Sequence, residues 1–361
     1  SSVNFTTIRE VPLSLSSESE QLVKIAKIAK IAINFGRCFF KFFIWERINY
    51  YTFIHNAKKR TLLPDTTLTK NKMNTKLSPV IAGTMNWGLS DKKLSSKEMS
   101  NLIHVCLVNS ITTFDHADIY GGYTTESQFG EGFKESQITR DKVQFVSKCG
   151  IQYVCDARKN RIKHYDYSKD YIIWSVENSL KNLQTDYLDV FLLHRPSPLM
   201  IADEIAEAVE QLKKEGKILE FGLSNFTPSQ TDLIQQKTKV SYNQIQFSAT
   251  HFEPMLNGSL DHMQVHEIRP MAWNPLGSVF REDTGQTRRL KKVLAGLVEK
   301  YHLGSDVILL AWIMQHPSKV IPVAGTVNVA RIQQLTKASQ LILDKEDWFE
   351  IWTESMGNKV P

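Results

Sequence analysis

Three apolar segments of the chain each end in an ionisable side chain of a type that takes part in acid–base chemistry. Asp115 ends residues 112–115, Lys148 ends residues 143–148, and His194 ends residues 188–194. A fourth such group, Tyr120, comes shortly after Asp115. Burying an ionisable group is costly unless the group is paired. These positions therefore predict that the side chains meet one another in the folded protein.

Together the four groups have the chemistry needed to protonate a developing alkoxide. A phenol has an ordinary pKa of about 10, which is too high for efficient proton transfer at neutral pH. A nearby ammonium lowers the pKa of a phenol, and a carboxylate keeps that ammonium charged. We therefore expect Asp115, Lys148 and Tyr120 to form a relay with Tyr120 as the proton donor. His194 would hydrogen-bond the carbonyl oxygen of a substrate.

Each of these residues also has an ordinary structural interpretation. Asp115 could cap a helix or a turn, Lys148 could extend to water, and His194 could be a hydrogen-bonded core histidine. Perturbed ionisable groups mark functional sites only statistically, so no single residue carries the hypothesis. It depends on a fold that brings all four to one place.

From Leu77 onward the sequence alternates apolar segments typical of strands with segments of helical periodicity. The predicted strands are residues 80–84, 112–115, 143–148, 188–194, 219–223, 242–247, 270–273 and 320–323. Eight strand–helix units in about 280 residues are typical of a (β/α)8 TIM barrel. In that fold the carboxyl ends of the strands share one mouth, where the four ionisable groups would meet.

Helix boundaries support this alternation. Ser95 and Glu98 have the spacing of a capping box. Thr227-Pro228 is typical of an N-cap followed by proline in the first helical turn. Gly216 is placed as a helix stop.

A doubly wound parallel sheet is the structural alternative. A dinucleotide-binding sheet of that kind usually has a Gly-x-Gly-x-x-Gly motif after its first strand. The nearest match, Gly130-Glu131-Gly132, has no third glycine and lies in a predicted helix. The pattern therefore favours the barrel.

The set Asp115, Tyr120, Lys148 and His194 resembles the catalytic tetrad of the aldo-keto reductase superfamily. Residues 114–121 and 123–126 are similar to its bacterial-type, oxidoreductase-like branch. The resemblance extends over about residues 76–361, including residues 348–352 and 359–361. One departure is His116, where the superfamily more often has Thr.

This resemblance implies a role for each matched residue. Tyr120 would be the general acid in reduction, Lys148 and Asp115 would tune its pKa, and His194 would orient the carbonyl group. The cofactor would be NADPH/NADP+, laid across the barrel mouth. Its nicotinamide would be held by Ser224, Asn225 and Gln244, which would hydrogen-bond the carboxamide, and by Trp273, which would stack on the ring where many relatives have Tyr.

The resemblance places the adenosine phosphate end of the cofactor after the last strand. The residues implied there are Gly325, Thr326, Asn328 and Arg331. Arg331 suits a 2′-phosphate through bidentate contacts, which favours NADPH over NADH. Many relatives carry Lys where this chain has Gly325.

The sequence thus predicts a barrel enzyme that reduces a small aldehyde or ketone with NADPH. The alternative is a cofactor-binding regulatory or scaffold subunit with little turnover. A pure binding protein has no need of all four ionisable groups, which favours the enzyme. We expect a monomer or a weak oligomer, and no partner among nucleic acids or membranes for the barrel itself.

Residues 1–72 differ from the predicted barrel domain at residues 73–361. They contain 12 Lys and Arg against 5 Asp and Glu, whereas the remainder is balanced at 32 against 33. We expect a poorly ordered extension or a segment outside the native domain. A membrane-surface or targeting segment is the alternative, against which Glu10, Glu18 and Glu20 argue. Four cysteines without a paired framework indicate a reducing compartment, so the cytoplasm is expected.

Three further features have structural interpretations. Cys149 should point away from Lys148, because side chains alternate along a strand, and is expected in the core. His262 and His266 could share a helix face, but the sequence shows no third ligand, so we expect a surface pair and no metal site. The basic residues 287–292 are expected on a solvated helix face.

Overall fold

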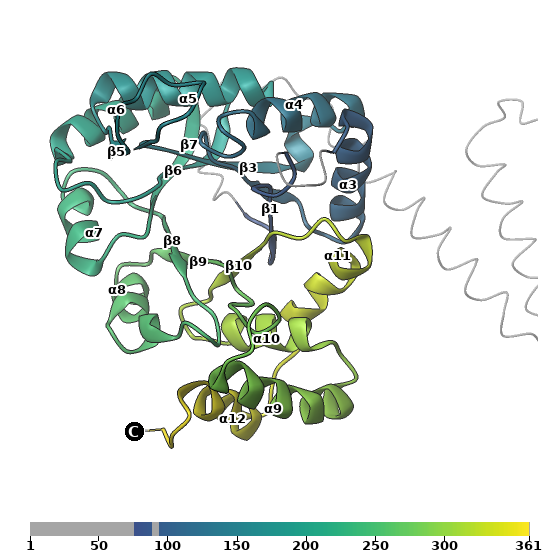
Figure 1. Cartoon of the computed structure of the whole chain (residues 1–361). Coiled ribbons are helices and arrows are strands. Elements are labelled where there is room, and N and C mark those ends of the chain that lie inside the picture. The colour runs from purple at the N-terminus through teal and green to yellow at the C-terminus, as the bar shows by residue number, and fades with distance from the viewer. Residues whose placement is uncertain (1–75, 89–93, 361) are drawn as a thin grey trace, which may run out of the picture. The chain divides into compact units, whose positions relative to one another are not determined.

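The computed structural model describes residues 76–88 and 94–360, which belong to one compact unit (Figure 1). The predicted extension at residues 1–72 lies outside the described residues.

Among the described residues, eight parallel strands form a closed barrel in the order β1-β10-β9-β8-β7-β6-β3-β2. The ring closes where Ile81 of the first strand pairs with Val323 of the last. In Figure 1 the strands lie at the centre and the helices surround them. The strands are β1 (Ile81–Gly83), β2 (Thr113–Asp115), β3 (Gln144–Cys149), β6 (Leu188–Leu193), β7 (Ile218–Ser224), β8 (Tyr242–Gln246), β9 (Arg269–Trp273) and β10 (Ile321–Ala324).

The predicted TIM barrel is therefore confirmed, and each predicted strand matches an observed one to within two residues at either end. The first strand is shorter than predicted because the chain turns after Gly83. Thr84 is then fixed to β2 by bonds from its amide and its hydroxyl to the Asp115 carbonyl, both 3.0 Å long.

Helices follow the strands and cover the outside of the barrel (Figure 1). They are α3 (Ser96–Val108), α4 (Thr125–Ser136), α5 (Lys169–Leu183), α6 (Ala202–Lys214), α7 (Pro228–Gln235), α8 (Ser259–Val265), α9 (Gly285–Tyr301), α10 (Ser305–Met314), α11 (Val329–Leu335) and α12 (Lys345–Met356). The helix signals in the sequence are present. Ser95 and Thr227 both form capping boxes, and Gly216 follows α6 with a φ of 72°.

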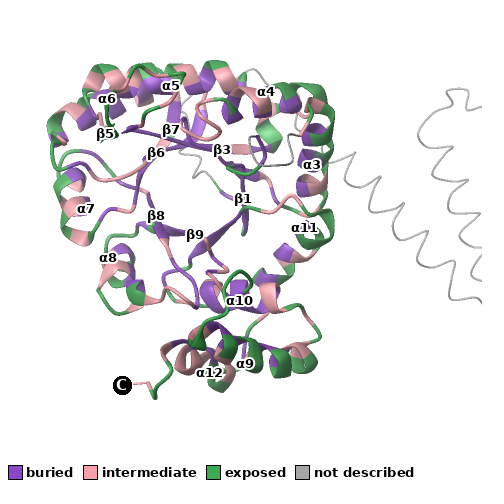
Figure 2. Cartoon of the chain, in the orientation of Figure 1, coloured by how far each residue is buried: buried purple, intermediate pink, exposed green. Residues whose placement is uncertain are grey.

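Apolar side chains pack in two layers. A small cluster fills the barrel interior and includes Val146, Val190 and Met271. A larger cluster lies between strands and helices, so the strands are buried on both sides and the helices expose their outer faces (Figure 2). Cys149 belongs to the outer cluster whereas Val146, three residues earlier, belongs to the inner one. The expected core position of Cys149 is confirmed, and Lys148 shares the inward side with Val146.

Two further groups of elements lie outside the eight strand–helix units of the barrel. A short antiparallel pair, β4 (Ile151–Gln152) and β5 (His164–Tyr165), follows β3. At the carboxyl end, α12 packs on α9, and Trp348 stacks on Trp312 of α10 with ring centroids 5.0 Å apart. Each of these indoles donates its N–H to the backbone carbonyl of the other residue.

Within the described part of the chain, no helix is long and apolar enough to cross a bilayer.

Candidate active site

The carboxyl ends of β2 and β3 bring Asp115, Lys148 and Tyr120 together. The Lys148 ammonium is fully buried and lies 2.8 and 2.7 Å from the two carboxylate oxygens of Asp115. It also donates to the backbone carbonyl of His116 at 2.6 Å and to the hydroxyl of Tyr120 at 3.3 Å. The three side chains of the predicted relay are therefore connected by hydrogen bonds through Lys148.

Electrostatics keep the buried Lys148 charged. Burial lowers the pKa of its ammonium, but attraction to Asp115 and contact with Tyr120 outweigh burial, so the pKa is raised above its usual value. Gln244 of β8 donates its amide N–H to Oδ1 of the same Asp115 carboxylate at 2.9 Å. A charged donor at Lys148 thus stands permanently beside the phenol.

The acidity of Tyr120 differs from the sequence-based expectation. Burial raises the pKa of its phenol above the usual value, and the opposing effect of Lys148 is smaller. Lys148 lowers the pKa of the phenol, as expected, but burial raises that pKa by more, because a desolvated phenolate is costly even beside a cation that is itself paired with Asp115. Tyr120 is protonated at neutral pH, which is the form that can donate a proton.

His194 follows β6 and lies beside Tyr120, with ring centroids 6.0 Å apart and planes at 81°. Burial and the nearby charges of Lys148 and Arg195 hold its pKa well below the usual value, so its imidazole is neutral. Its Nδ1 is buried and has no hydrogen-bond partner among the described residues. A neutral imidazole beside the phenol has the donor chemistry to hydrogen-bond the oxygen of a substrate.

His116, the departure from the superfamily pattern, is buried directly behind the relay. Its Nδ1 lies 2.9 Å from the Thr84 hydroxyl, and its backbone carbonyl accepts a hydrogen bond from Lys148. Burial, with smaller effects of Lys148 and Arg140, keeps its pKa well below the usual value. The substitution therefore adds no charge to the site.

Residues expected at the nicotinamide lie at the ends of β7, β8 and β9. The Asn225 amide donates to the Ser224 hydroxyl at 2.8 Å and to the His194 carbonyl at 3.3 Å. Its oxygen accepts the indole N–H of Trp273 at 2.8 Å. Asn225 has a φ of 62°, a strained conformation that is often found at functional sites. Gln244 donates its amide N–H groups to Asp115 and to the sulfur of Met271, so its Oε1 is the atom with acceptor capacity.

The segment after β10 forms a compact turn into α11. The Thr326 hydroxyl accepts the amide N–H of Asn328 at 3.1 Å, and the Asn328 side chain accepts that of Arg331 at 3.2 Å. Gly325 and Arg331 are exposed, and the Arg331 guanidinium has no ion-pair partner among the described residues. An exposed guanidinium at this position can bind a phosphate group.

Sequence reasoning assigned no role to two ionisable residues near the site. Arg195 directly follows His194, and its guanidinium lies 5.6 Å from the ring centroid of Trp273. Asp118 lies in the turn before Tyr120, where burial and repulsion from Glu126 raise the pKa of its carboxyl to about 8. Both follow strand ends in the sequence, so their position alone was the signal that could have singled them out.

A closed parallel barrel with ionisable groups at the carboxyl ends of its strands defines the class of this protein as a TIM-barrel enzyme fold. Residues 79–353 match the model of the aldo/keto reductase family. The chain belongs to this family, and it is an oxidoreductase of the TIM-barrel class.

Curated relatives agree with this assignment. The chain is 41% identical over 281 residues to the uncharacterized oxidoreductase YcsN of Bacillus subtilis, a match of 76% of this chain and 94% of that protein. Oxidoreductase YdhF of Escherichia coli is 40% identical, with coverage of 76% and 93%. A 6-dehydroglucose reductase of Agrobacterium fabrum is 37% identical, with coverage of 79% and 96%.

Solved structures share the fold. An aldo-keto reductase from Klebsiella pneumoniae in complex with NADPH superposes with a TM-score of 0.62 at 23% identity, over 76% of this chain and 90% of that one. The thermostable aldo-keto reductase Tm1743 superposes with a TM-score of 0.66 at 22% identity, over 81% and 100%.

Proposed function

We propose that this protein reduces the carbonyl group of an aldehyde or ketone to an alcohol with NADPH, and that Tyr120 is the proton donor. The observation that carries the proposal is the buried set in which Lys148 contacts both Asp115 and the Tyr120 hydroxyl. Reduced nicotinamide supplies the hydride that adds to the carbonyl carbon. The proton that completes the alcohol comes from the Tyr120 hydroxyl, and both steps reverse in alcohol oxidation.

The surrounding groups divide the work of binding and proton transfer. The neutral His194 donates a ring N–H to the substrate oxygen and orients it toward the phenol. As the proton leaves Tyr120, the charged Lys148 stabilises the phenolate that forms. Asp115 balances the charge of Lys148, so the buried ammonium is paired.

The nicotinamide would be held by Ser224, Asn225, Gln244 and Trp273, and the adenosine end by Gly325, Thr326, Asn328 and Arg331. The Asn225 side chain fits an amide ligand, because three hydrogen bonds hold it in place and its Oδ1 can accept one further N–H. The exposed guanidinium of Arg331 favours the 2′-phosphate of NADPH. The family relative that was solved with NADPH supports this choice of cofactor.

A binding protein with little turnover is the competing function. A binding protein has no need of the buried Lys148–Asp115 pair at the ends of two neighbouring strands. Stability does not explain the pair either, because buried ion pairs contribute little to stability. A panel of small aldehydes, ketones and oxidised sugars, assayed for oxidation of NADPH and of NADH, separates the two. We expect turnover with at least one substrate class and a preference for NADPH. Tight NADPH binding without turnover of any carbonyl compound would favour the scaffold.

A further inference from the structure

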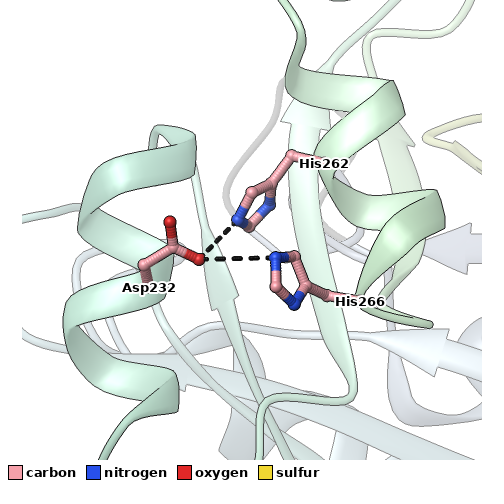
Figure 3. A group of neighbouring side chains, drawn as sticks. All are labelled: Asp232, His262 and His266. Atoms are coloured by element: carbon pink, nitrogen blue, oxygen red, sulfur yellow. Dashed lines mark hydrogen bonds and ion pairs between the residues drawn. The ribbon is translucent and has the colours of Figure 1, made fainter.

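A second cluster of ionisable side chains lies between α7 and α8 (Figure 3). It consists of Asp232 in α7, His262 in α8, and His266, which follows α8 directly. Both imidazoles point at the same carboxylate oxygen, with Nε2 of His262 at 2.6 Å and Nε2 of His266 at 3.6 Å from Oδ1 of Asp232. The sequence showed no third partner for the histidine pair. The fold supplies it from a residue 30 positions before His262.

We propose that Asp232, His262 and His266 bind a divalent transition-metal ion, with Zn²⁺ as the best match. Two histidines four residues apart on one helix face are a common chelating pair. Two imidazoles and one carboxylate are a ligand set that suits zinc, with a water molecule completing four-coordination. The three ligand atoms already lie within 4.8 Å of one another.

The distances fit a tetrahedral ion after a small adjustment. Metal–ligand bonds of about 2.0 Å place neighbouring ligand atoms about 3.3 Å apart. The Asp232–His266 separation of 3.6 Å is close to that value, and the Asp232–His262 separation of 2.6 Å must open by less than an ångström. His262 is the fixed member because its side chain is 13% exposed, whereas those of Asp232 and His266 are 47% and 38% exposed and can move.

A neighbouring glutamine supplies a second, independent observation. Gln235 places its amide nitrogen 3.5 Å from Nδ1 of His266, while its Oε1 is buried without a hydrogen-bond partner among the described residues. A half-turn of this amide brings Oε1 to Nδ1, where it accepts the ring N–H and leaves Nε2 of His266 free as a ligand. Metal-binding histidines are commonly oriented by such an acceptor on the other ring nitrogen.

The position of the cluster indicates a structural role for the ion. Helices of a TIM barrel run back from the catalytic mouth, and Asp232 lies in the second half of α7 while His266 lies beyond the end of α8. The cluster is therefore toward the opposite, stability-determining end of the barrel. An ion there would link the two helices that flank β8, and it would take no part in carbonyl reduction.

Titration of ZnCl2 into the full-length protein by calorimetry tests the site. We expect the wild-type protein to bind one Zn²⁺ ion. The variants His266→Gln and Asp232→Asn should each bind it at least tenfold more weakly. His251→Gln is the matched control, because His251 lies 3.2 Å from the Glu253 carboxylate but belongs to no three-ligand cluster among the described residues, and this variant should bind Zn²⁺ as wild type does. Free Zn²⁺ at one hundred times the Kd should raise the Tm of wild type by about 5 °C, and that of His266→Gln far less.

Cobalt gives a second readout that does not depend on stability. Co²⁺ bound by His262, His266 and Asp232 should give the intense visible absorption of a tetrahedral site, and Zn²⁺ should displace it. Equal Zn²⁺ affinity in wild type and His266→Gln, or a wild-type Kd weaker than about 1 mM, would overturn the site. Since all readouts are metal binding, either result leaves the proposed carbonyl reduction untouched.

Discussion

Two opposed effects determine the protonation state of the Tyr120 hydroxyl. Burial favours the protonated phenol, while Lys148, 3.3 Å away, favours the phenolate. The protonated form dominates in the resting protein, and the ammonium is already in place to stabilise the charge that appears during proton transfer. A donor of this kind needs no reorganisation of its surroundings when it reacts.

Tyr120→Phe removes the hydroxyl and keeps the ring. We expect kcat for carbonyl reduction to fall at least about 10²-fold, the usual contribution of a general acid, while the Kd for NADPH changes little. Stopped-flow turnover and fluorescence titration measure the two quantities. Tyr123→Phe is a matched control because the Tyr123 hydroxyl donates to the Ile151 carbonyl, 3.1 Å away, and not to the relay. A Tyr120→Phe variant as active as this control would refute the assigned proton donor.

Lys148→Met tests the second member of the relay. It keeps much of the side-chain volume but removes the charge that stabilises a phenolate, so we expect a loss of kcat comparable to that of Tyr120→Phe. A different acid of lower pKa would supply the proton for the remaining reduction. As pH rises, kcat should therefore begin to fall at a lower pH than in wild type, which a pH profile of kcat measures. Retained kcat in both variants would remove the mechanism.

Asp118 makes the stability of the protein depend on pH. Its pKa is raised to about 8, so the folded protein holds a proton that the unfolded chain releases near pH 4. The folded state therefore loses stability from this group as pH rises from about 4 to about 8, by at most about 6 kcal/mol. Asp118→Asn removes the titration and keeps an acceptor for the Tyr171 and Ser175 hydroxyls, both 3.3 Å from Oδ2. The Tm of the variant should exceed that of wild type by more at pH 8 than at pH 5; a constant difference would contradict this.

Gly325 offers a test of cofactor choice. Within residues 76–88 and 94–360, a Cβ at this position would meet only the Asn86 amide, at 3.7 Å, so there is room for a longer side chain. Gly325→Lys places a cation near Arg331, and we expect NADPH to bind about fivefold more tightly with little change for NADH. Gly325→Gln has a long side chain without the charge and should bind both as wild type does. Equal gains for NADPH and NADH in the lysine variant would place the 2′-phosphate elsewhere.

At the scale of elements, the start of α7 links the stability of a helix to the cofactor site. Thr227 caps this helix through a capping box with Gln230 and comes two residues after Asn225. Thr227→Ala should lower stability by about 1 kcal/mol and should also weaken NADPH binding, because it loosens the segment that holds Asn225. Ser95→Ala removes the equivalent capping box of α3 and should cost similar stability without that loss. Thermal unfolding and NADPH titration compare them.

The elements were the most predictable part of the molecule. Apolar segments bounded by caps and turns predicted all eight barrel strands. Because Asp115, Lys148 and His194 lie at strand ends, the same pattern predicted that they would come together at one end of the barrel. The pair β4 and β5 was not predicted, because its strands are two residues long and show no alternation. Asp232 was missed as well, since its meeting with His262 depends on how α7 packs against α8. The pKa of Tyr120 depends on the balance of burial and charge, which spacing in a sequence does not give.

At the scale of the whole molecule, the family match begins at residue 79 and relatives are covered over more than nine-tenths of their length. We therefore expect a protein that begins at Met73 to fold and to reduce carbonyl compounds with the kcat and KM of the full chain. Steady-state assays on both forms measure this. A shortened protein that folds but has lost activity would show that residues 1–72 contribute to catalysis.

The closure of the barrel also bears on how the protein is made. Ile81 pairs with Val323, and Gln244 reaches across 129 residues to hydrogen-bond Asp115. A nascent chain leaves the ribosome with β1 first, so one edge of that strand stays open until almost all of the polypeptide has been synthesised. Contacts so distant in sequence slow folding and leave an unpaired edge exposed to other chains. Production of this enzyme should therefore depend on chaperones that shield the early strands during translation.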